Sequence, residues 1–109
     1  MTTTTLTTPA GVTNVELTDD GFFVDPTLWT DDMVPELAAR EGIDAVTDGH
    51  WKIVRFMRTE YLTKGTGPSV RALGKTSGVS VKDLYLLFPK GPAKIAARIA
   101  GIPKPKGCI

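Results

Sequence analysis

The segment SVRALGKTSGVSVKDLYLLFP, residues 69–89, outlines two short helices joined by a tight turn. Residues 69–76 form the first predicted helix and residues 81–88 the second, with apolar side chains at helical spacing in each. Between them, the Gly-Val-Ser sequence at 78–80 is typical of a turn, and Ser80 is a favoured residue for the N-cap of the following helix. The segment therefore predicts a helix-turn-helix motif.

Three further helices are predicted around this motif. The longest runs from an N-cap at Thr47 to about Lys64, and its inward stripe includes His50, the only histidine of the chain. We assign His50 a packing role in the first helical turn, because no second metal ligand or nucleophile lies near it in the sequence. The other two helices are predicted over residues 31–41 and 91–100.

The N-terminal part predicts less regular structure. Residues 1–11 contain a Thr tract with little apolar surface to bury, so we expect a disordered N-terminal tract. Two β-prone runs follow, Val12–Leu17 and Phe22–Val24, on either side of the Asp-Asp-Gly sequence at 19–21. This arrangement predicts a β-hairpin.

These elements define the expected fold class. We predict a mainly α protein, a small orthogonal helical bundle that contains a helix-turn-helix, with an N-terminal β-hairpin and a flexible C-terminal arm. The helical domain covers residues 12–101 and the arm residues 102–109. A chain of 109 residues is long enough for one such domain. No signal-peptide pattern or membrane-length apolar stretch is found, so we expect a cytoplasmic protein without membrane contact.

Charge is divided unevenly along the chain, although the formal net charge is only +1. Residues 1–50 contain ten Asp and Glu and one Arg, whereas residues 51–109 contain two acidic and twelve basic residues. Either the two halves pair within the fold, or the C-terminal half offers a basic surface to an acidic partner or to nucleic acid. The sequence leaves both interpretations open.

The last nine residues, GIPKPKGCI at 101–109, contain the only cysteine, Cys108. Pro103 and Pro105 exclude a continuing helix and favour an extended path, on which the seven residues from 102 to 108 span about 20 Å. Gly107 leaves room beside the thiol for a partner's backbone. A lone cysteine cannot close an intrachain disulfide, but it can form mixed disulfides or carry a persulfide. We therefore predict a thiol presented to partners on a short arm.

Several cations accompany this thiol. Lys104 and Lys106 lie within four residues of Cys108, and Lys94 and Arg98 form a basic edge on the last predicted helix. Salt screens exposed charges of this kind, so we expect them to steer docking rather than to activate the thiol. The predicted partner-binding residues are Lys94, Arg98, Lys104, Lys106 and Gly107.

Nucleic-acid binding is the alternative raised by the helix-turn-helix, since residues 77–89 are similar to the recognition segment of tetracycline-repressor-type regulators. Between Ser80 and Phe88, however, the predicted recognition helix offers one cation, Lys82, directly beside Asp83. It contains no Arg, Asn or Gln that would read base edges. We therefore favour an architectural role for the motif and do not expect direct nucleic-acid binding.

Residue clusters across the chain resemble the DsrC/TusE family of sulfur-relay proteins. The most specific cluster is an LYxLFPxGPAK segment, a short helix and then a GxPKPxGC tail. The resemblance rests on Asp20-Gly21-Phe22, Gly49-His50-Trp51, Arg58, Tyr61, Pro68, Arg71, Leu84 to Pro89, Gly91 to Lys94 and Gly101 to Ile109. It implies a mainly helical fold with a β-hairpin, a helix-turn-helix and a mobile arm. It also implies that Cys108 accepts and donates sulfur as a persulfide.

One difference from DsrC proteins proper indicates which branch of this family the chain resembles more. DsrC proteins proper carry a second cysteine on the last helix, at the position of Ala97 in this chain. Without that thiol the chain cannot hold sulfur between two of its own cysteines. It therefore looks more like single-cysteine, TusE-like carriers, which relay sulfur toward tRNA 2-thiouridine synthesis. A DsrC-like carrier or regulator in dissimilatory sulfur metabolism is the alternative.

The resemblance also implies partners. A TusBCD/DsrEFH-like complex would donate sulfur, and a tRNA thiouridylase-like enzyme or, in the alternative, dissimilatory sulfite reductase would accept it. We expect no cofactor and no metal, only a covalent persulfide on Cys108. The protein would then be a sulfurtransferase-type carrier that other enzymes turn over, rather than a self-contained enzyme.

Overall fold

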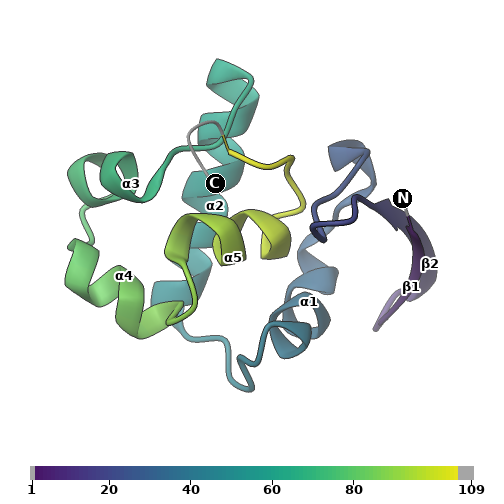
Figure 1. Cartoon of the computed structure of the whole chain (residues 1–109). Coiled ribbons are helices and arrows are strands. Elements are labelled where there is room, and N and C mark those ends of the chain that lie inside the picture. The colour runs from purple at the N-terminus through teal and green to yellow at the C-terminus, as the bar shows by residue number, and fades with distance from the viewer. Residues whose placement is uncertain (1, 106–109) are drawn as a thin grey trace.

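The computed structural model describes residues 2–105 as a β-hairpin followed by a helical bundle (Figure 1). This confirms the predicted mainly α fold class, including the N-terminal hairpin and the helix-turn-helix. Within the described residues, no helix has both the length and the apolar character needed to cross a membrane. The elements are β1 (Thr2–Thr8), β2 (Gly11–Leu17), η1 (Pro26–Leu28), η2 (Asp31–Met33), α1 (Val34–Arg40), α2 (Asp48–Lys64), α3 (Val70–Thr76), α4 (Val81–Leu87) and α5 (Pro92–Ile99).

The hairpin includes residues that the sequence assigns to a disordered tract. β1 pairs antiparallel with β2 along its whole length, from Thr2 opposite Leu17 to Thr8 opposite Gly11. The prediction of disorder over residues 1–11 is therefore wrong for β1. The physical reason is that β-branched Thr suits an extended strand, and that one apolar residue per strand, Leu6 or Val15, is enough to attach the sheet to the core.

The turn predicted at residues 19–21 is present but does not close the main hairpin. Past it, Leu17 and Phe23 form a single antiparallel bridge, and Val24 donates its N–H to the Glu16 carbonyl across 3.1 Å. Both Phe22 and Phe23 are buried, so this short return of the chain covers the core instead of extending the sheet.

Hydrogen bonds cap the helix starts at the two predicted caps, Thr47 and Ser80, and also at Ser69. Ser69 and Ser80 each accept a hydrogen bond from a backbone N–H in the first turn of α3 and α4, at 3.2 Å in both cases. At the start of α2, Thr47 donates its backbone N–H to His50 Nδ1 across 3.0 Å, which completes a capping box. His50 is therefore a buried structural residue, as predicted.

α5 lies at the centre of the bundle. It packs against α1, α2, α3 and α4, and in Figure 1 it crosses in front of α2, with α3 and α4 on one side and α1 on the other. Its small side chains allow this close packing from several directions. The buried residues of α5 are Pro92, Ala93, Ile95, Ala96, Ala97 and Ile99. The end of the chain therefore leaves from a rigid central helix.

Candidate functional site

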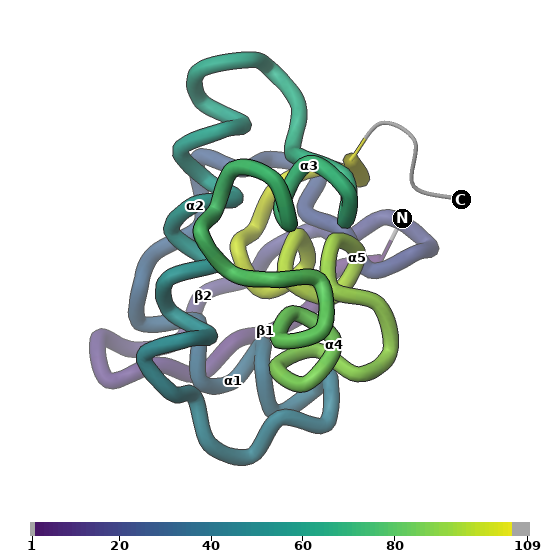
Figure 2. The backbone as a smooth tube through the Cα atoms, turned by 90° about the vertical axis from the view of Figure 1, so that its left-hand side faces the viewer, coloured from purple at the N-terminus to yellow at the C-terminus, as the bar shows by residue number. Residues whose placement is uncertain are grey.

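The first described residues of the C-terminal arm, Ile102–Pro105, pack against the domain. Ile102 is fully buried and Pro105 is also buried, whereas Lys104 is exposed. Ile102 and Pro105 both contact Gly67, in the loop that leads into α3. A Cβ added to Gly67 would lie 2.7 Å from Ile102 Cδ1 and 3.5 Å from Pro105 Cγ. Figure 2 shows this end of the chain near α3. The sequence places the start of the arm at residue 102, but packing holds the chain to the domain as far as Pro105.

Two side chains from distant segments hold the end of α5, just before the arm. Trp29 donates its indole N–H to the Ile99 carbonyl across 2.8 Å, and Arg58 Nη1 donates to the Ala100 carbonyl, also across 2.8 Å. The Arg58 guanidinium lies 4.3 Å from the centre of the Trp29 ring, within cation–π range. Burial lowers the pKa of Arg58, while the nearby Asp31 carboxylate opposes this effect. These contacts satisfy carbonyls that a helix end leaves free.

Gly101 makes the turn from α5 into the arm. Its φ of +66° belongs to the left-handed region, and a Cβ at this position would overlap the Trp29 ring. The N–H of Ile102 then returns to the Ala97 carbonyl across 3.1 Å. Only glycine combines this backbone conformation with this close approach, so the residue fixes the direction in which the arm departs.

The structure brings two of the predicted partner-binding residues together at Asp20. Arg98 Nε donates to the Asp20 carbonyl across 2.8 Å, and Lys104 Nζ lies 3.3 Å from Asp20 Oδ2. Arg98 also pairs with Glu41 at 3.1 Å, and both side chains are largely buried. Arg98 therefore connects α5 to the loop after β2 and to the end of α1, which is a positioning role that the sequence does not indicate. Lys94 lies one helical turn before Arg98 on α5.

The remaining predicted site residues, Lys106, Gly107 and Cys108, lie outside the described residues. Ala97, at the position of the second cysteine of DsrC proteins proper, is fully buried in the core. Its carbonyl is the one that accepts from Ile102, so this position is directly beside the start of the arm. Here it contributes a methyl group and no thiol.

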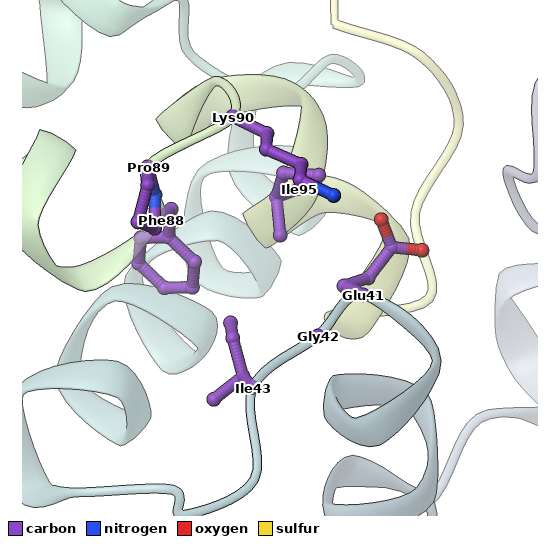
Figure 3. A pocket seen from close by; sticks show the side chains of 7 residues that line it. All are labelled: Glu41, Gly42, Ile43, Phe88, Pro89, Lys90 and Ile95. Carbon is purple, nitrogen blue, oxygen red and sulfur yellow. The ribbon is translucent and has the colours of Figure 1, made fainter.

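Hollows are also present in the described part of the chain, and two of them are large enough to consider. The first is a pocket of about 140 Å³ with mostly apolar walls, below the roughly 300–1,000 Å³ of common ligand sites. Figure 3 shows Glu41 and Lys90 at its edges, and it is lined by Glu41, Gly42, Ile43, Phe88, Pro89, Lys90 and Ile95. The second, of about 370 Å³, lies between the hairpin and η1. Of the described residues predicted for the site, Lys94, Arg98 and Lys104, none lines either hollow.

Sequence reasoning did not identify Trp29, Arg58 or Gly67 as parts of the arm's support. Arg58 appears in the family resemblance, but its spacing in α2 indicates only a residue beside the buried stripe. Its partners, Pro26 and Ala100, lie 32 and 42 residues away along the chain. No local sequence pattern predicts contacts over such separations. The Gly67-Pro68 sequence indicates a loop, but it does not predict that Ile102 and Pro105 pack against it.

The fold and these contacts define a class: a small helical domain whose central last helix leads into an anchored C-terminal arm with a penultimate cysteine. The chain belongs to the DsrC-like protein family, since the family model described as "DsrC like protein" matches residues 10–109.

Relatives of two kinds support this assignment. The sulfurtransferase TusE of Pectobacterium atrosepticum is 46% identical, covering 82% of this chain and 87% of the relative. The gamma subunit of dissimilatory-type sulfite reductase of Nitratidesulfovibrio vulgaris is 39% identical, covering 86% and 90%. A crystal structure described as dissimilatory sulfite reductase I (DsrI) superposes with a TM-score of 0.82 at 36% identity, covering 97% of this chain and 100% of the other. The chain is thus similar to sulfurtransferases and to sulfite reductase subunits of one family.

Proposed function

We propose that this protein is a sulfur carrier that accepts and donates persulfide sulfur through Cys108. The observation that carries the proposal is the family match, which runs to residue 109 and so includes the chain's only cysteine. The names of the relatives, sulfurtransferase and sulfite reductase subunit, imply a sulfur-relay partner system for this family. The packing of Ile102–Pro105, the base of the arm, against the domain supports the proposal, because it limits where a partner can bind the thiol.

The transfer step needs no external oxidant. The Cys108 thiolate attacks the outer sulfur of a persulfide on the donor protein. A new S–S bond forms on Cys108, the S–S bond of the donor breaks, and the donor leaves as a thiolate. Donation to an acceptor thiolate is the same exchange in reverse. The protein contributes presentation of the thiol, while its reactivity is set by the partner's pocket.

The held arm base limits how far the thiol reaches. Cys108 lies three positions after Pro105 in the sequence, and a fully extended chain spans at most about 3.6 Å per residue, or about 11 Å in total. This is about half of the reach that the sequence suggests for an arm free from residue 102. A donor or acceptor therefore has to contact the domain itself near Gly67 and the start of α3 in order to receive the thiol.

Ala97 favours a role in tRNA 2-thiouridine synthesis over a role with dissimilatory sulfite reductase. With a methyl group at this position, a loaded sulfur stays on Cys108 and passes only to another protein. The proposed donor is a TusBCD/DsrEFH-like complex and the proposed acceptor a tRNA thiouridylase-like enzyme. Since free thiols persist in reducing compartments, we place the carrier in the cytoplasm.

Mass spectrometry after incubation with a persulfide donor tests the proposal. The wild-type protein should gain about 32 Da, the mass of one sulfur atom, on the peptide that contains Cys108. The Cys108→Ser variant should fold normally and gain nothing. Equal labelling of the two proteins would exclude Cys108 as the carrier. Transfer of labelled sulfur from the loaded protein to a tRNA thiouridylase, and not to sulfite reductase, should then separate the two pathways.

A further inference from the structure

The outer face of α4, the second helix of the helix-turn-helix, exposes large apolar side chains. Val81, Tyr85 and Leu86 are 43%, 48% and 70% exposed, whereas Leu84 and Phe88, on the inner face, are fully buried. Val81 and Tyr85 are one helical turn apart, and so are Lys82 and Leu86, so these four side chains share one continuous face. We call this face the α4 surface. Contiguous apolar exposure on a helix is typical of an interaction site.

The α4 surface is held rigidly. Gly74 of α3 lets the two helices approach so closely that a Cβ there would lie 2.5 Å from Val81 Cγ2. At the other end of α4, His50 Nε2 donates to the Leu87 carbonyl across 2.9 Å, and the His50 and Phe88 rings meet edge to face. A surface fixed in this way loses little conformational entropy on binding.

The described cations without an intramolecular partner all fall in the part of the chain from α2 to α5. Six cations among residues 2–105 form ion pairs or hydrogen bonds within the chain: Arg40, Arg55, Arg58, Lys64, Arg98 and Lys104. One of the remaining lysines, Lys52, reaches the turn of the helix-turn-helix: its Nζ would lie 3.5 Å from a Cβ added to Gly78. The described Lys and Arg residues for which no such bond is found are Lys52, Arg71, Lys75, Lys82, Lys90 and Lys94, all between the start of α2 and α5.

We propose that the α4 surface docks an acidic protein partner, with Tyr85 and Leu86 entering an apolar depression and Lys52, Lys75 and Lys82 facing carboxylates around it. Charge complementarity selects an acidic partner, because Lys82 lies on the exposed apolar face and Lys52 reaches the turn that precedes α4. An amphipathic aromatic residue such as Tyr85 is common at the energetic centre of protein interfaces. DNA fits less well, since the α4 surface presents one cation and no side chain suited to reading base edges.

This inference rests on the proposed function and adds a second contact to it. The partner is the protein that donates sulfur, which docks on the α4 surface while the arm enters its active site. The helix-turn-helix connects both features: Gly67, which contacts the base of the arm, lies two residues before the N-cap of α3, and the α4 surface lies on the second helix of the motif. A two-point contact gives the donor specificity that an arm of about 11 Å cannot supply alone.

The test compares two sulfur sources on the same variants. Leu86→Glu and Lys82→Glu introduce negative charge on the α4 surface, and Val12→Glu is the matched control, since Val12 is 67% exposed in the hairpin on the opposite side of the molecule. Each protein is loaded either by the TusBCD-like donor complex of the same organism or by inorganic polysulfide. We expect Leu86→Glu and Lys82→Glu to load at least tenfold more slowly from the donor complex. Loading from polysulfide should stay unchanged, and Val12→Glu should match wild type with both sources.

The outcomes separate this inference from the proposed function. If wild type is loaded by neither source, the carrier function itself fails. If wild type and both α4 variants load equally fast from the donor complex, the docking surface is overturned while the carrier function stands. Loss of binding to a random-sequence DNA duplex in Leu86→Glu, without any change in loading, would also overturn it and assign the surface to nucleic acid.

Discussion

Arg58 donates a 2.8 Å hydrogen bond to the carbonyl of Ala100, so the middle of α2 holds the last turn before the arm. A second guanidinium nitrogen lies 3.3 Å from the Pro26 carbonyl, and the whole group covers the Trp29 ring. One side chain thus ties η1, α2 and the end of α5 together. The position from which the arm departs depends on contacts between segments that are far apart in the sequence.

Removal of this guanidinium should destabilise the protein. Arg58→Met keeps the apolar stem but leaves the Ala100 carbonyl without its donor, while the Pro26 carbonyl keeps only the Trp29 N–H. The free energy of unfolding should therefore fall by about 2 kcal/mol. Arg55→Met is the control on the same helix: its ion pair with Asp31 spans 3.7 Å on the surface, and its loss should cost less than about 0.5 kcal/mol. Urea unfolding measures both. A similar loss in the two variants would contradict the assigned role of Arg58.

The turn at Gly101 gives a second prediction. Gly101→Ala places a methyl group against the Trp29 ring at a residue with φ of +66°, and should cost about 3 kcal/mol through backbone strain and overpacking. Gly42→Ala has a similar φ of +84° with no atom within 4 Å, so it should cost only about 1 kcal/mol of strain. The difference between the two unfolding free energies measures the Trp29 contact. Equal values would show that Trp29 gives way.

His50 supports the α4 surface from below. Because Nδ1 accepts from the Thr47 N–H, the hydrogen bond to the Leu87 carbonyl is donated by Nε2. His50→Ala should lower the free energy of unfolding by about 2 kcal/mol, since Leu87 and Thr47 then lose their partners. His50→Gln, which can still form the capping box, should recover part of this loss. Hydrogen exchange of the first α2 amides should report the difference.

Lys104 is predicted to contribute little to the stability of the fold and more to the docking of a donor. Its pair with Asp20 is exposed on both sides, so Lys104→Ala and Asp20→Ala should each change the unfolding free energy by less than about 1 kcal/mol. If Lys104 steers a donor, only Lys104→Ala should slow loading by the donor complex, and the effect should shrink at high salt. Equal loading by the two variants and the wild type would rule out a steering role for this lysine.

Asp25 provides a pH-dependent prediction at η1. Its carboxylate accepts from the hydroxyl and the backbone N–H of Thr27, at 2.6 and 3.0 Å, and these bonds lower the pKa of Asp25 below its usual 3.8. Its contribution to stability is therefore complete above pH 3.8 and is lost as the pH falls through the lower value of the folded state. Thr27→Ala should raise the pKa of Asp25 toward normal, as an NMR titration of its carboxyl carbon would show.

Local signals in the sequence were sufficient for the helices. Thr47, Ser69 and Ser80 offer side chains that satisfy the first free N–H groups, so each helix start is set within a few residues. The end of α5 is also set by a local signal, because the chain turns at Gly101, where no other residue fits. One local error concerns Thr2–Thr8: low hydrophobicity indicated disorder, while the β-branched side chains favoured the strand that forms. Another is the turn at residues 19–21, which was expected to close the hairpin but instead leads to a single bridge.

The sequence by itself determined the helices, their caps and a penultimate cysteine on a proline-stiffened tail, because these depend on residues within one or two turns of each other. Only the tertiary structure decided that the tail is held as far as Pro105, that Arg98 links α5 to Asp20 and Glu41, and that Arg58 and Trp29 secure the end of α5. These contacts join residues up to 78 positions apart. Their partners are selected when the core closes, and no local pattern encodes that choice.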